Sequence, residues 1–421
     1  MPTPIAKAPE PELGSGIIHK DRYTTREFMA LEWERMWTKV WLLGPRLSDL
    51  AKVGDYVCEE IGPESVIFVR AAEGPKGLKA LYNVCPHRGN RLRNPGAGRV
   101  PSFRCPYHFF EFELDGSQKH IPDLSDFRQG CPADSVRMRE LRAESWGGWL
   151  WFSFADDAEP LREYLGVLPE HLDPYHFEDQ FLIRDLTIEW DCNWKTSVDA
   201  FNEVFHVQAI HPQLLEMLDD INVQIDLYER HNRYLVPFGV LSPRYANQEE
   251  VTQALREMML AAGINPESFP GRAKEVRPAL IAAARQQGAE RGIDYSELND
   301  DQMVDDYHYM IFPNVTLNIH YSGMMLFRQR PHPTDPNKMF FDLQNFERLP
   351  PEQGAPPRIA HRHFRHGETT LGLVLDQDAY NLPRVQRGMN SRAFEGLHIN
   401  YKERRIRHMH RTIDGYLAEG A

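Results

Sequence analysis

Short runs of β-branched and aromatic residues dominate the chain from Val40 to about Phe154. They include DYVCEEI, SVIFVR, ALYNV, FEFEL and GGWLWFSF, and Gly, Pro and Asp turns separate them. Such runs are typical of strands, because these side chains fit a pleated, half-buried surface. The pattern predicts an all-β domain of short strands.

The pattern changes after Asp156. The run FLIRDLTIEWDCNW predicts a strand by its alternation, residues 197–210 predict a helix, and residues 248–292 predict helical structure broken at Gly263 and Pro266. The runs YHYMIF, VTLNIHY, GMMLFRQRP and KMFFDLQNF predict an antiparallel meander, and the Arg-rich tail from about residue 375 to residue 417 is predicted to be helical. We therefore expect an α+β fold in which a β domain is inserted early in a larger domain.

The first 39 residues are expected to be a lead followed by the first helix of the larger domain. The lead MPTPIAKAPEPELGSG has no apolar core, so it predicts a flexible Pro-rich segment rather than a signal peptide. Thr24 and Glu27 fit a capping box, with Thr24 at the N-cap. The predicted boundaries are 1–39 for this part, 40–157 for the β domain, and 158–421 for the rest of the larger domain, with a helical insertion at 248–292.

Composition narrows the class of protein. The 421 residues are 42% hydrophobic and 26% charged, as in an ordinary globular protein. No stretch reaches the apolar length needed to span a bilayer, and the expected location is the cytoplasm. The formal net charge of −13 argues against a nucleic-acid binder, which needs a basic surface.

Five cysteines in a long chain are too few, and odd in number, for a disulfide framework. They are Cys58, Cys85, Cys105, Cys131 and Cys192. Two of them stand near histidines, in Cys85-Pro-His87-Arg-Gly and Cys105-Pro-Tyr-His108. Two Cys and two His can hold a zinc ion or a Rieske [2Fe–2S] cluster. The spacing favours the iron–sulfur cluster, because C-x-H is unusual for zinc.

A second group of possible ligands follows in VDAFNEVFHVQAIHP, which ends at Pro212. Two His and one carboxylate can hold a non-haem Fe(II) and leave positions open for oxygen and substrate. His206 and His211 are five residues apart, about 140° on an ideal helix, which is poor for joint ligation. Pro212 disfavours helical geometry at His211, so the helix is expected to end or distort before it. Spacing alone still favours a capping or core histidine.

The paired loops CPHRG and CPYH, followed by an aromatic strand and Asp115-Gly116, resemble the cluster-binding loops of the Rieske family. The resemblance to Rieske non-haem iron oxygenase catalytic (α) subunits of the aromatic ring-hydroxylating dioxygenase family extends over nearly the whole chain. It implies that Cys85, His87, Cys105 and His108 bind one [2Fe–2S] cluster. Ring-hydroxylating members usually have CPYHGW, whereas this chain has Phe109 and Phe110 after His108.

The segment N-x-x-x-H-x4-H, beginning at Asn202, resembles the mononuclear-iron segment of the same family. The resemblance implies that His206 and His211 are iron ligands and that Glu203 is the bridging carboxylate, a position more often occupied by Asp. The third ligand is expected near the C-terminal helix. An Asp eight residues before Gln386 matches the family pattern and selects Asp378, with Asp376 as the alternative.

The resemblance also implies a β Rieske domain and a helix-grip catalytic domain with an antiparallel sheet. The implied activity is the oxygenation of a small substrate with O2, and we expect this substrate to be aromatic. The reaction would be dihydroxylation, monohydroxylation or oxidative demethylation. Electrons from NAD(P)H would arrive through a separate ferredoxin and/or reductase, because the chain has no dinucleotide, flavin or second-cluster motif. In this family the cluster of one subunit serves the iron of its neighbour in a trimer.

Two alternatives remain open from the residues alone. A non-enzymatic Rieske electron carrier, or a zinc-stabilised binding protein, needs only the first group of Cys and His. The iron content per chain separates these alternatives from an oxygenase.

Five arginines lie in the cluster loops: Arg88, Arg91, Arg93, Arg99 and Arg104. They are either a solvated surface or a docking patch for an acidic electron donor.

Overall fold

The computed structural model describes residues 5–130, 136–354 and 356–418. The first four residues of the Pro-rich lead and Cys131 lie outside these ranges. The chain divides into two compact units, Trp33–Gly166 and a larger unit made of Met1–Glu32 with Val167–Ala421. None of the described helices is long and apolar enough to cross a membrane.

The unit Trp33–Gly166 is built from short strands, as the alternation of apolar runs and turns predicts. Its main sheet has the order β2-β11-β10-β5-β4-β3-β6 and its small sheet the order β7-β8-β9. The strands are β2 (Trp41–Arg46), β3 (Asp55–Ile61), β4 (Glu64–Arg70), β5 (Leu78–Tyr82), β6 (Gly96–Arg99), β7 (Phe103–Arg104), β8 (Glu111–Phe112), β9 (Gln118–His120), β10 (Glu140–Trp146) and β11 (Trp149–Ser153). One short helix, α3 (Leu161–Leu165), follows them.

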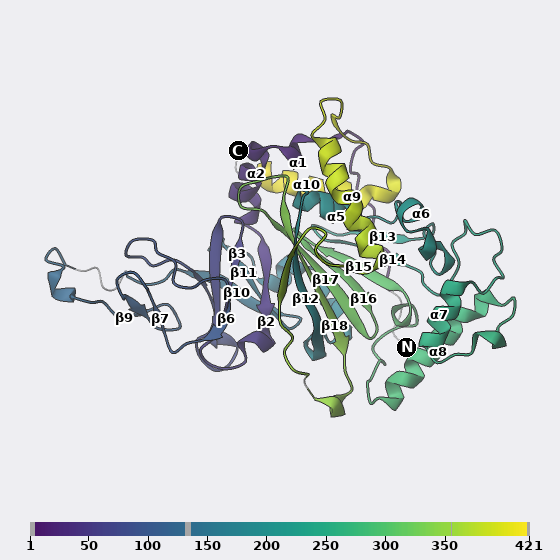
Figure 1. The fold of residues 1–421 in the computed structure, drawn as a ribbon, viewed down its shortest axis with the longest axis horizontal. Coiled ribbons are helices and arrows are strands. Elements are labelled where there is room, and N and C mark those ends of the chain that lie inside the picture. The colour runs from purple at the N-terminus through teal and green to yellow at the C-terminus, as the bar shows by residue number, and fades with distance from the viewer. Residues whose placement is uncertain (1–4, 131–135, 355, 419–421) are drawn as a thin grey trace. The chain divides into compact units, whose positions relative to one another are not determined.

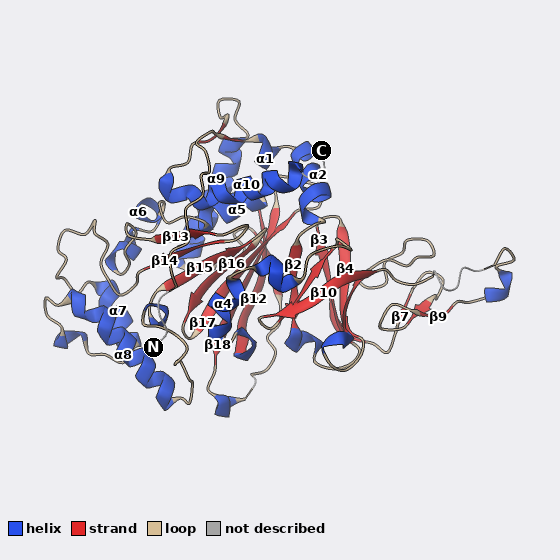
Figure 2. Cartoon of the chain, turned by 180° about the vertical axis from the view of Figure 1, so that it is seen from behind, coloured by secondary structure: helices blue, strands red, loops and turns tan. Residues whose placement is uncertain are grey.

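The larger unit is organised around one sheet of eight strands in the order β13-β14-β15-β16-β17-β18-β12-β19. Figure 2 shows the long strands of this sheet from behind. The strands are β12 (Gln180–Trp190), β13 (Gln224–Leu227), β14 (Asn232–Val236), β15 (Asp306–Ile311), β16 (Val315–His320), β17 (Gly323–Pro331), β18 (Met339–Arg348) and β19 (Arg362–Arg365). A separate two-stranded pair joins β1 (Ile18–His19) to β20 (Gly396–Leu397). The predicted meander is β15 to β18.

Helices of the larger unit gather on one side of this sheet. Figure 1 shows α5, α9 and α10 together above the strands, with α7 and α8 beyond the β13–β14 end. The helices are α1 (Asp21–Thr24), α2 (Arg26–Glu32), α4 (Leu168–Leu172), α5 (Trp194–Phe201), α6 (Val207–Ile210), α7 (Gln253–Ala261), α8 (Val276–Glu290), α9 (Leu373–Met389) and α10 (Arg404–Ala418). This α+β arrangement is the predicted fold class.

Side-chain hydrogen bonds fasten α5 to α9. The amide oxygen of Gln386 accepts from the backbone N–H of Asn193 and from the hydroxyl of Thr196, both at 2.9 Å. All three residues are buried, and satisfied buried polar groups fix a single packing arrangement. The start of α5 and the C-terminal part of α9 are therefore held together, and the site described below draws its residues from α9 and from the segment that follows α5.

Two local predictions are wrong. Residues 197–210 are not one helix, because α5 ends at Phe201 and α6 begins at Val207. The tail is helical as predicted, in the two helices α9 and α10. The capping box at Thr24 is absent, since the Thr24 hydroxyl donates to the carbonyl of Lys20, and Thr25 instead accepts from the backbone N–H of Phe28.

Candidate metal centres

Two loops with the same backbone pattern carry the first group of ligands. The Cys85 N–H donates to the carbonyl of Asn90 and its carbonyl accepts from Gly89 N–H. The Cys105 N–H donates to Phe110, and its carbonyl accepts from Phe109 N–H, at 2.8 and 3.0 Å. Each loop thus turns back on its own cysteine and presents one thiol beside one imidazole.

The four side chains of these loops suit a metal centre. The rings of His87 and His108 lie 4.7 Å apart, and Nδ1 of His108 is buried without a hydrogen-bond partner among the described residues. Burial raises the pKa of the Cys85 thiol to about 11, so a bound cation is needed to populate the thiolate. Burial and the neighbouring His108 lower the pKa of His87, which favours the neutral imidazole that ligates metals.

We expect the purified protein to be brown, with the visible and reduced-state EPR spectra of a mixed Cys/His [2Fe–2S] cluster. Cys105→Ala should lose these signals and lower the melting temperature of the β unit, because metal binding contributes folding free energy. Colourless protein holding one zinc per chain, even after anaerobic reconstitution with iron and sulfide, would contradict this prediction.

Phe109 occupies the position in the Cys105 loop that Gly89 occupies in the Cys85 loop. It has φ +59°, and its counterpart Gly89 has φ +76°. A left-handed backbone costs a residue with a side chain roughly 1–2 kcal/mol, but costs glycine little. The Phe109 ring is 52% exposed and lies under the guanidinium of Arg104, at 4.3 Å, a contact that offsets part of this strain.

Phe109→Gly is therefore expected to stabilise the β unit by up to about 1 kcal/mol without changing the cluster spectrum. The matched control is Gly89→Ala, whose added Cβ meets no atom within 4 Å, so that it adds backbone strain alone. Thermal unfolding followed through the cluster absorbance measures both. If Phe109→Gly lowered the melting temperature as much as Gly89→Ala does, the backbone of Phe109 would not be strained.

The five arginines of these loops make local contacts. Arg91 pairs with Glu60, and Arg99 with Asp55 at 2.6 Å. The other three lie over aromatic rings: Arg88 over Tyr107, Arg93 over Tyr56 and Phe103, and Arg104 over Phe109. These contacts fit a solvated surface and a docking patch equally well.

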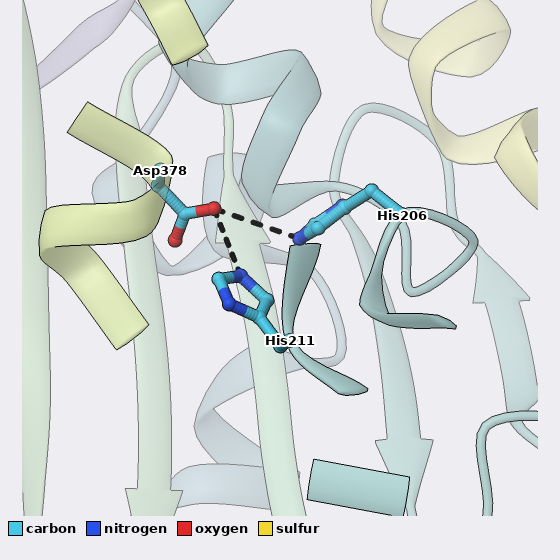
Figure 3. A group of neighbouring side chains, drawn as sticks. All are labelled: His206, His211 and Asp378. Carbon is cyan, nitrogen blue, oxygen red and sulfur yellow. Dashed lines mark hydrogen bonds and ion pairs between the residues drawn. The ribbon is translucent and has the colours of Figure 1, made fainter. Parts of the chain in front are cut away.

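The second group of ligands comes together from two segments. His206 lies in the turn between α5 and α6, His211 follows α6, and Asp378 lies on α9. One ligand atom from each lies within 4.8 Å of the other two. Figure 3 shows the two imidazoles directed toward the carboxylate of Asp378. His211 has φ −121° and ψ 50°, so the helix ends before it, as Pro212 predicts.

Each imidazole makes a hydrogen bond through the nitrogen that faces away from Asp378, so its other nitrogen can bind a metal. Nδ1 of His206 bonds to Glu203, and Nδ1 of His211 bonds to Gln377 at 2.7 Å. The Nε2 atoms of His206 and His211 then lie 3.7 and 2.9 Å from Oδ1 of Asp378. Ligands bonded to one ion at about 2.1 Å and 90° are about 3 Å apart, so the three atoms have the spacing of a facial triad.

The alternative ligand Asp376 has a different role in the structure. Its carboxylate accepts from the Thr370 hydroxyl at 2.5 Å and from the Leu371 N–H at 2.7 Å. These bonds tie the Asp376 side chain to the segment that precedes α9, and Asp376 is not among the described residues that gather at the candidate metal site. The geometry therefore favours Asp378.

Glu203 and Asn202 lie next to this group, in the segment that interrupts the predicted helix. Oε2 of Glu203 accepts from the backbone N–H groups of Phe205 and His206, and Glu203 is only 8% exposed. Their spacing of three residues predicts that Glu203 and His206 share a helix face and that the carboxylate bonds the free nitrogen of the imidazole. They do not lie on one helix, but the bond is present. Asn202 is fully buried, and its side-chain amide has no partner among the described residues.

A largely apolar cavity of about 410 Å³ opens beside the three ligands. His206, His211, Asp378 and Glu203 contribute to its wall, together with apolar residues of α5, of the sheet and of the segment 371–375. None of the described residues that line this cavity belongs to the insertion 248–292, whose helices pack in a separate apolar core. From the sequence we also expect this insertion to cover the entrance of the substrate pocket, and that expectation stays a prediction.

Sequence reasoning missed Gln377 and the sheet residues that line the cavity. Gln377 stands between the two candidate aspartates, so its position beside a ligand could have been noticed. The sheet residues have a weaker signal: Asn318 and His320 alternate with apolar residues in the run VTLNIH. Polar residues on one face of a buried strand indicate a wall of a site.

Comparison with known proteins agrees with both centres. Residues 177–419 match the model of the ring hydroxylating alpha subunit (catalytic domain), and residues 41–134 match the Rieske [2Fe-2S] domain. The chain belongs to the family of Rieske non-haem iron oxygenase alpha subunits. The predictions of family, fold class and enzyme class are therefore confirmed.

Individual relatives are more distant. The chain is 30% identical over 226 residues to the carnitine monooxygenase oxygenase subunit of Escherichia coli (strain K12), covering 52% of this chain and 58% of the relative. It is 28% identical over 204 residues to the glycine betaine monooxygenase oxygenase subunit of Pseudomonas aeruginosa, covering 47% and 46%. The matches thus span about half the length of these curated relatives.

A solved structure shares the fold over nearly the whole chain. It is a quaternary ammonium Rieske monooxygenase, described in terms of carnitine oxidation by gut microbiota and inter-subunit electron transfer. The TM-score is 0.68, with 18% identity and 95% of each chain covered.

Proposed function

We propose that this chain is the oxygenase component of a Rieske system that adds one oxygen atom to a C–H bond of a small organic substrate. One observation carries the proposal: His206, His211 and Asp378 present three ligand atoms within 4.8 Å of one another on the wall of an apolar cavity. A simple electron carrier or a zinc-stabilised binding protein has no use for this second centre.

The residues fit two metal groups. Cys85, His87, Cys105 and His108 would hold one [2Fe–2S] cluster, and the His206, His211 and Asp378 group would hold one Fe(II). When bound, these groups supply electron transfer and the activation of O2. The boundaries 40–157 for the Rieske domain and 158–421 for the catalytic domain belong to the same proposal.

The protein's own residues prepare the second centre. Glu203 and Gln377 hold the imidazoles of His206 and His211 so that Nε2 of each faces the metal position. Burial lowers the pKa of His206, but the bond to Glu203 and the charges of Glu203 and Asp378 outweigh it, so that the net shift is upward. The apolar wall excludes water and positions the substrate beside the ligands.

The reaction needs electrons from outside the chain. Converting C–H to C–OH with one O2 consumes two electrons and two protons and releases one water. We propose that NAD(P)H supplies them through a separate ferredoxin and/or reductase, with Arg88 and Arg104 in the docking surface. A homotrimer and a cytoplasmic location belong to the same proposal.

Monooxygenation is favoured over dihydroxylation, because both curated relatives are named monooxygenases. Hydroxylation of an N-methyl carbon would release formaldehyde and so give demethylation. The apolar cavity accommodates the predicted aromatic ring, although carnitine and glycine betaine contain none.

The test is a single turnover of iron-loaded, chemically reduced protein with O2 and a panel of N-methylated, aromatic and aliphatic compounds. Product mass, formaldehyde and O2 uptake are measured together. We expect one oxygen atom from 18O2 in the product of at least one compound. Iron bound in both centres, with reoxidation by O2 but no oxygenated product across the panel, would contradict the proposed function.

A further inference from the structure

A polar patch interrupts the apolar wall of the cavity. Asp306 at the start of β15, and Asn318 and His320 on β16, all line it. The register pairs Tyr307 with Ile319, so alternate residues on the two strands direct these three side chains to the same face of the sheet. The patch therefore belongs to the strands themselves, which are rigid supports for a binding group.

Two polar atoms of this patch are buried without partners. Oδ1 of Asp306 and Nδ2 of Asn318 make no hydrogen bond among the described residues, and each residue is only 9% exposed. Leaving such groups unsatisfied costs roughly 1–3 kcal/mol each, and more for a charged group. Unsatisfied polar groups that line a substrate cavity indicate that a bound ligand makes the missing hydrogen bonds.

The cation whose charge acts on Asp306, Arg405, has no salt bridge to it among the described residues. Arg405 is fully buried and donates instead to Asn232 at 2.6 Å and to His308 at 3.0 Å. Burial raises the pKa of Asp306 to about 7, and the charge of Arg405 offsets this only in part. Burial also lowers the pKa of His320, so that ring supplies no positive charge. Asp306 lacks a counter-charge within the patch.

We propose that Asp306 and Asn318 form an anchoring subsite for a substrate amine that retains an N–H. The protonated amine donates to Oδ1 of Asp306 and supplies the missing positive charge. The Asn318 amide donates to an oxygen of the same substrate where one is present. This inference rests on the proposed function, because it names the substrate class of the same cavity.

The requirement for an N–H separates this subsite from a site for quaternary ammonium groups. A quaternary nitrogen brings charge but no donor, so Oδ1 of Asp306 would stay without a hydrogen bond. A site that hydrogen-bonds its ligand rejects analogues lacking the donor much more strongly than an apolar pocket rejects a missing methyl group. Because the subsite and the three metal ligands line one cavity, anchoring the amine also limits which carbon reaches the metal position.

The test measures binding rather than turnover, on anaerobic protein with both metal centres loaded. Three probes of similar shape are titrated by calorimetry: N,N-dimethylbenzylamine, which is a cation with an N–H at neutral pH; benzyltrimethylammonium, a cation without one; and uncharged isobutylbenzene. We expect N,N-dimethylbenzylamine to bind at least tenfold more tightly than either of the other probes. Asp306→Asn should remove most of that preference and leave the affinity for isobutylbenzene unchanged.

Asp300→Asn is the matched control, since this carboxylate is half-exposed, bonds Arg285 and lies outside the cavity lining; its affinities should equal those of the wild type. Thermal melting of Asp306→Asn is measured beside the wild type, because the buried Arg405 loses one of the charges that compensate it. If that variant fails to fold, the three-probe comparison on the wild type still decides.

Equal affinities for the amine and isobutylbenzene, an unchanged preference in Asp306→Asn, or equally tight binding of benzyltrimethylammonium would each overturn the subsite. Binding does not depend on oxygenation, so the measured affinities still test the subsite if the protein oxygenates none of the compounds. Conversely, oxygenation of neutral compounds without preference for the amine would support the function and overturn the subsite alone.

Discussion

Asp378→Ala is expected to abolish oxygenation while the Rieske spectrum stays normal. The variant loses the carboxylate whose Oδ1 lies 2.9 Å from Nε2 of His211 and 3.7 Å from Nε2 of His206. Two imidazoles alone bind Fe(II) weakly, so iron should fall from three to two atoms per chain. Loss of a supporting residue near a metal typically costs 10–100-fold, and loss of a ligand is expected to exceed that range.

Asp376→Ala is the matched control, two residues earlier on the same helix. Its carboxylate accepts from Thr370 and Leu371, just before α9, so the lost hydrogen bonds should cost about 1 kcal/mol of stability and leave the iron content unchanged. Iron analysis, the visible spectrum and single-turnover product yield are compared for both variants. Full activity in Asp378→Ala with loss of activity in Asp376→Ala would show that Asp376 is the third ligand.

The strands of the β unit show what the hydrophobic pattern alone can predict. The run DYVCEEI is β3 from end to end, and SVIFVR is β4 without its first residue. Each strand is bounded by turn residues and its apolar side chains are buried, so local preference and packing agree. The meander β15 to β18 was predictable for the same reason.

The helix predicted over 197–210 failed because of a competing local bond. No Gly or Pro interrupts these residues, so propensity alone favours a continuous helix. The carboxylate of Glu203 instead accepts from the backbone N–H groups of Phe205 and His206, which would otherwise continue the helical ladder. Such side-chain bonds to the backbone can replace helical ones. The break turns His206 toward α9 and makes joint ligation with His211 possible despite their spacing.

The cavity could not be predicted from the sequence, because it depends on the register between distant strands. Tyr234 of β14 faces His308 of β15, and Asn318 of β16 faces Met325 of β17. A shift of one residue in any of these pairs would move its side chains to the opposite face of the sheet. The candidate metal ligands could be predicted from the sequence only because they occur in short motifs.

Glu203→Gln is expected to reduce product formation at least tenfold while the iron–sulfur cluster is still reduced normally. Three hydrogen bonds converge on this carboxylate, from Nδ1 of His206 and from the backbone N–H groups of Phe205 and His206. Glutamine has the same size but only one oxygen, so its amide nitrogen must face at least one of these donors. If it faces His206, the ring must move its proton to Nε2, the atom needed for the metal.

An ionised carboxylate offers about four acceptor positions, and three are used within the chain. We propose that the fourth accepts from His108 of an adjacent subunit, which would make Glu203 the bridge between the two metal centres that the family resemblance implies. A bridge predicts that Glu203→Gln, saturated with Fe(II), still loses the fast reoxidation of its cluster by O2. A role confined to holding His206 predicts that excess Fe(II) restores that rate.

Stopped-flow absorbance of the cluster, recorded over a series of Fe(II) concentrations, separates these two roles. Glu216→Gln is the control, because this acid lies close by in the chain but outside the cavity lining; it should behave as the wild type. Glu203 is buried, so an effect of only a few tenths of a kcal/mol, as for an exposed charge, is not expected. Wild-type turnover in Glu203→Gln with an excess of electron donor would show that Glu203 neither holds His206 nor connects the two centres.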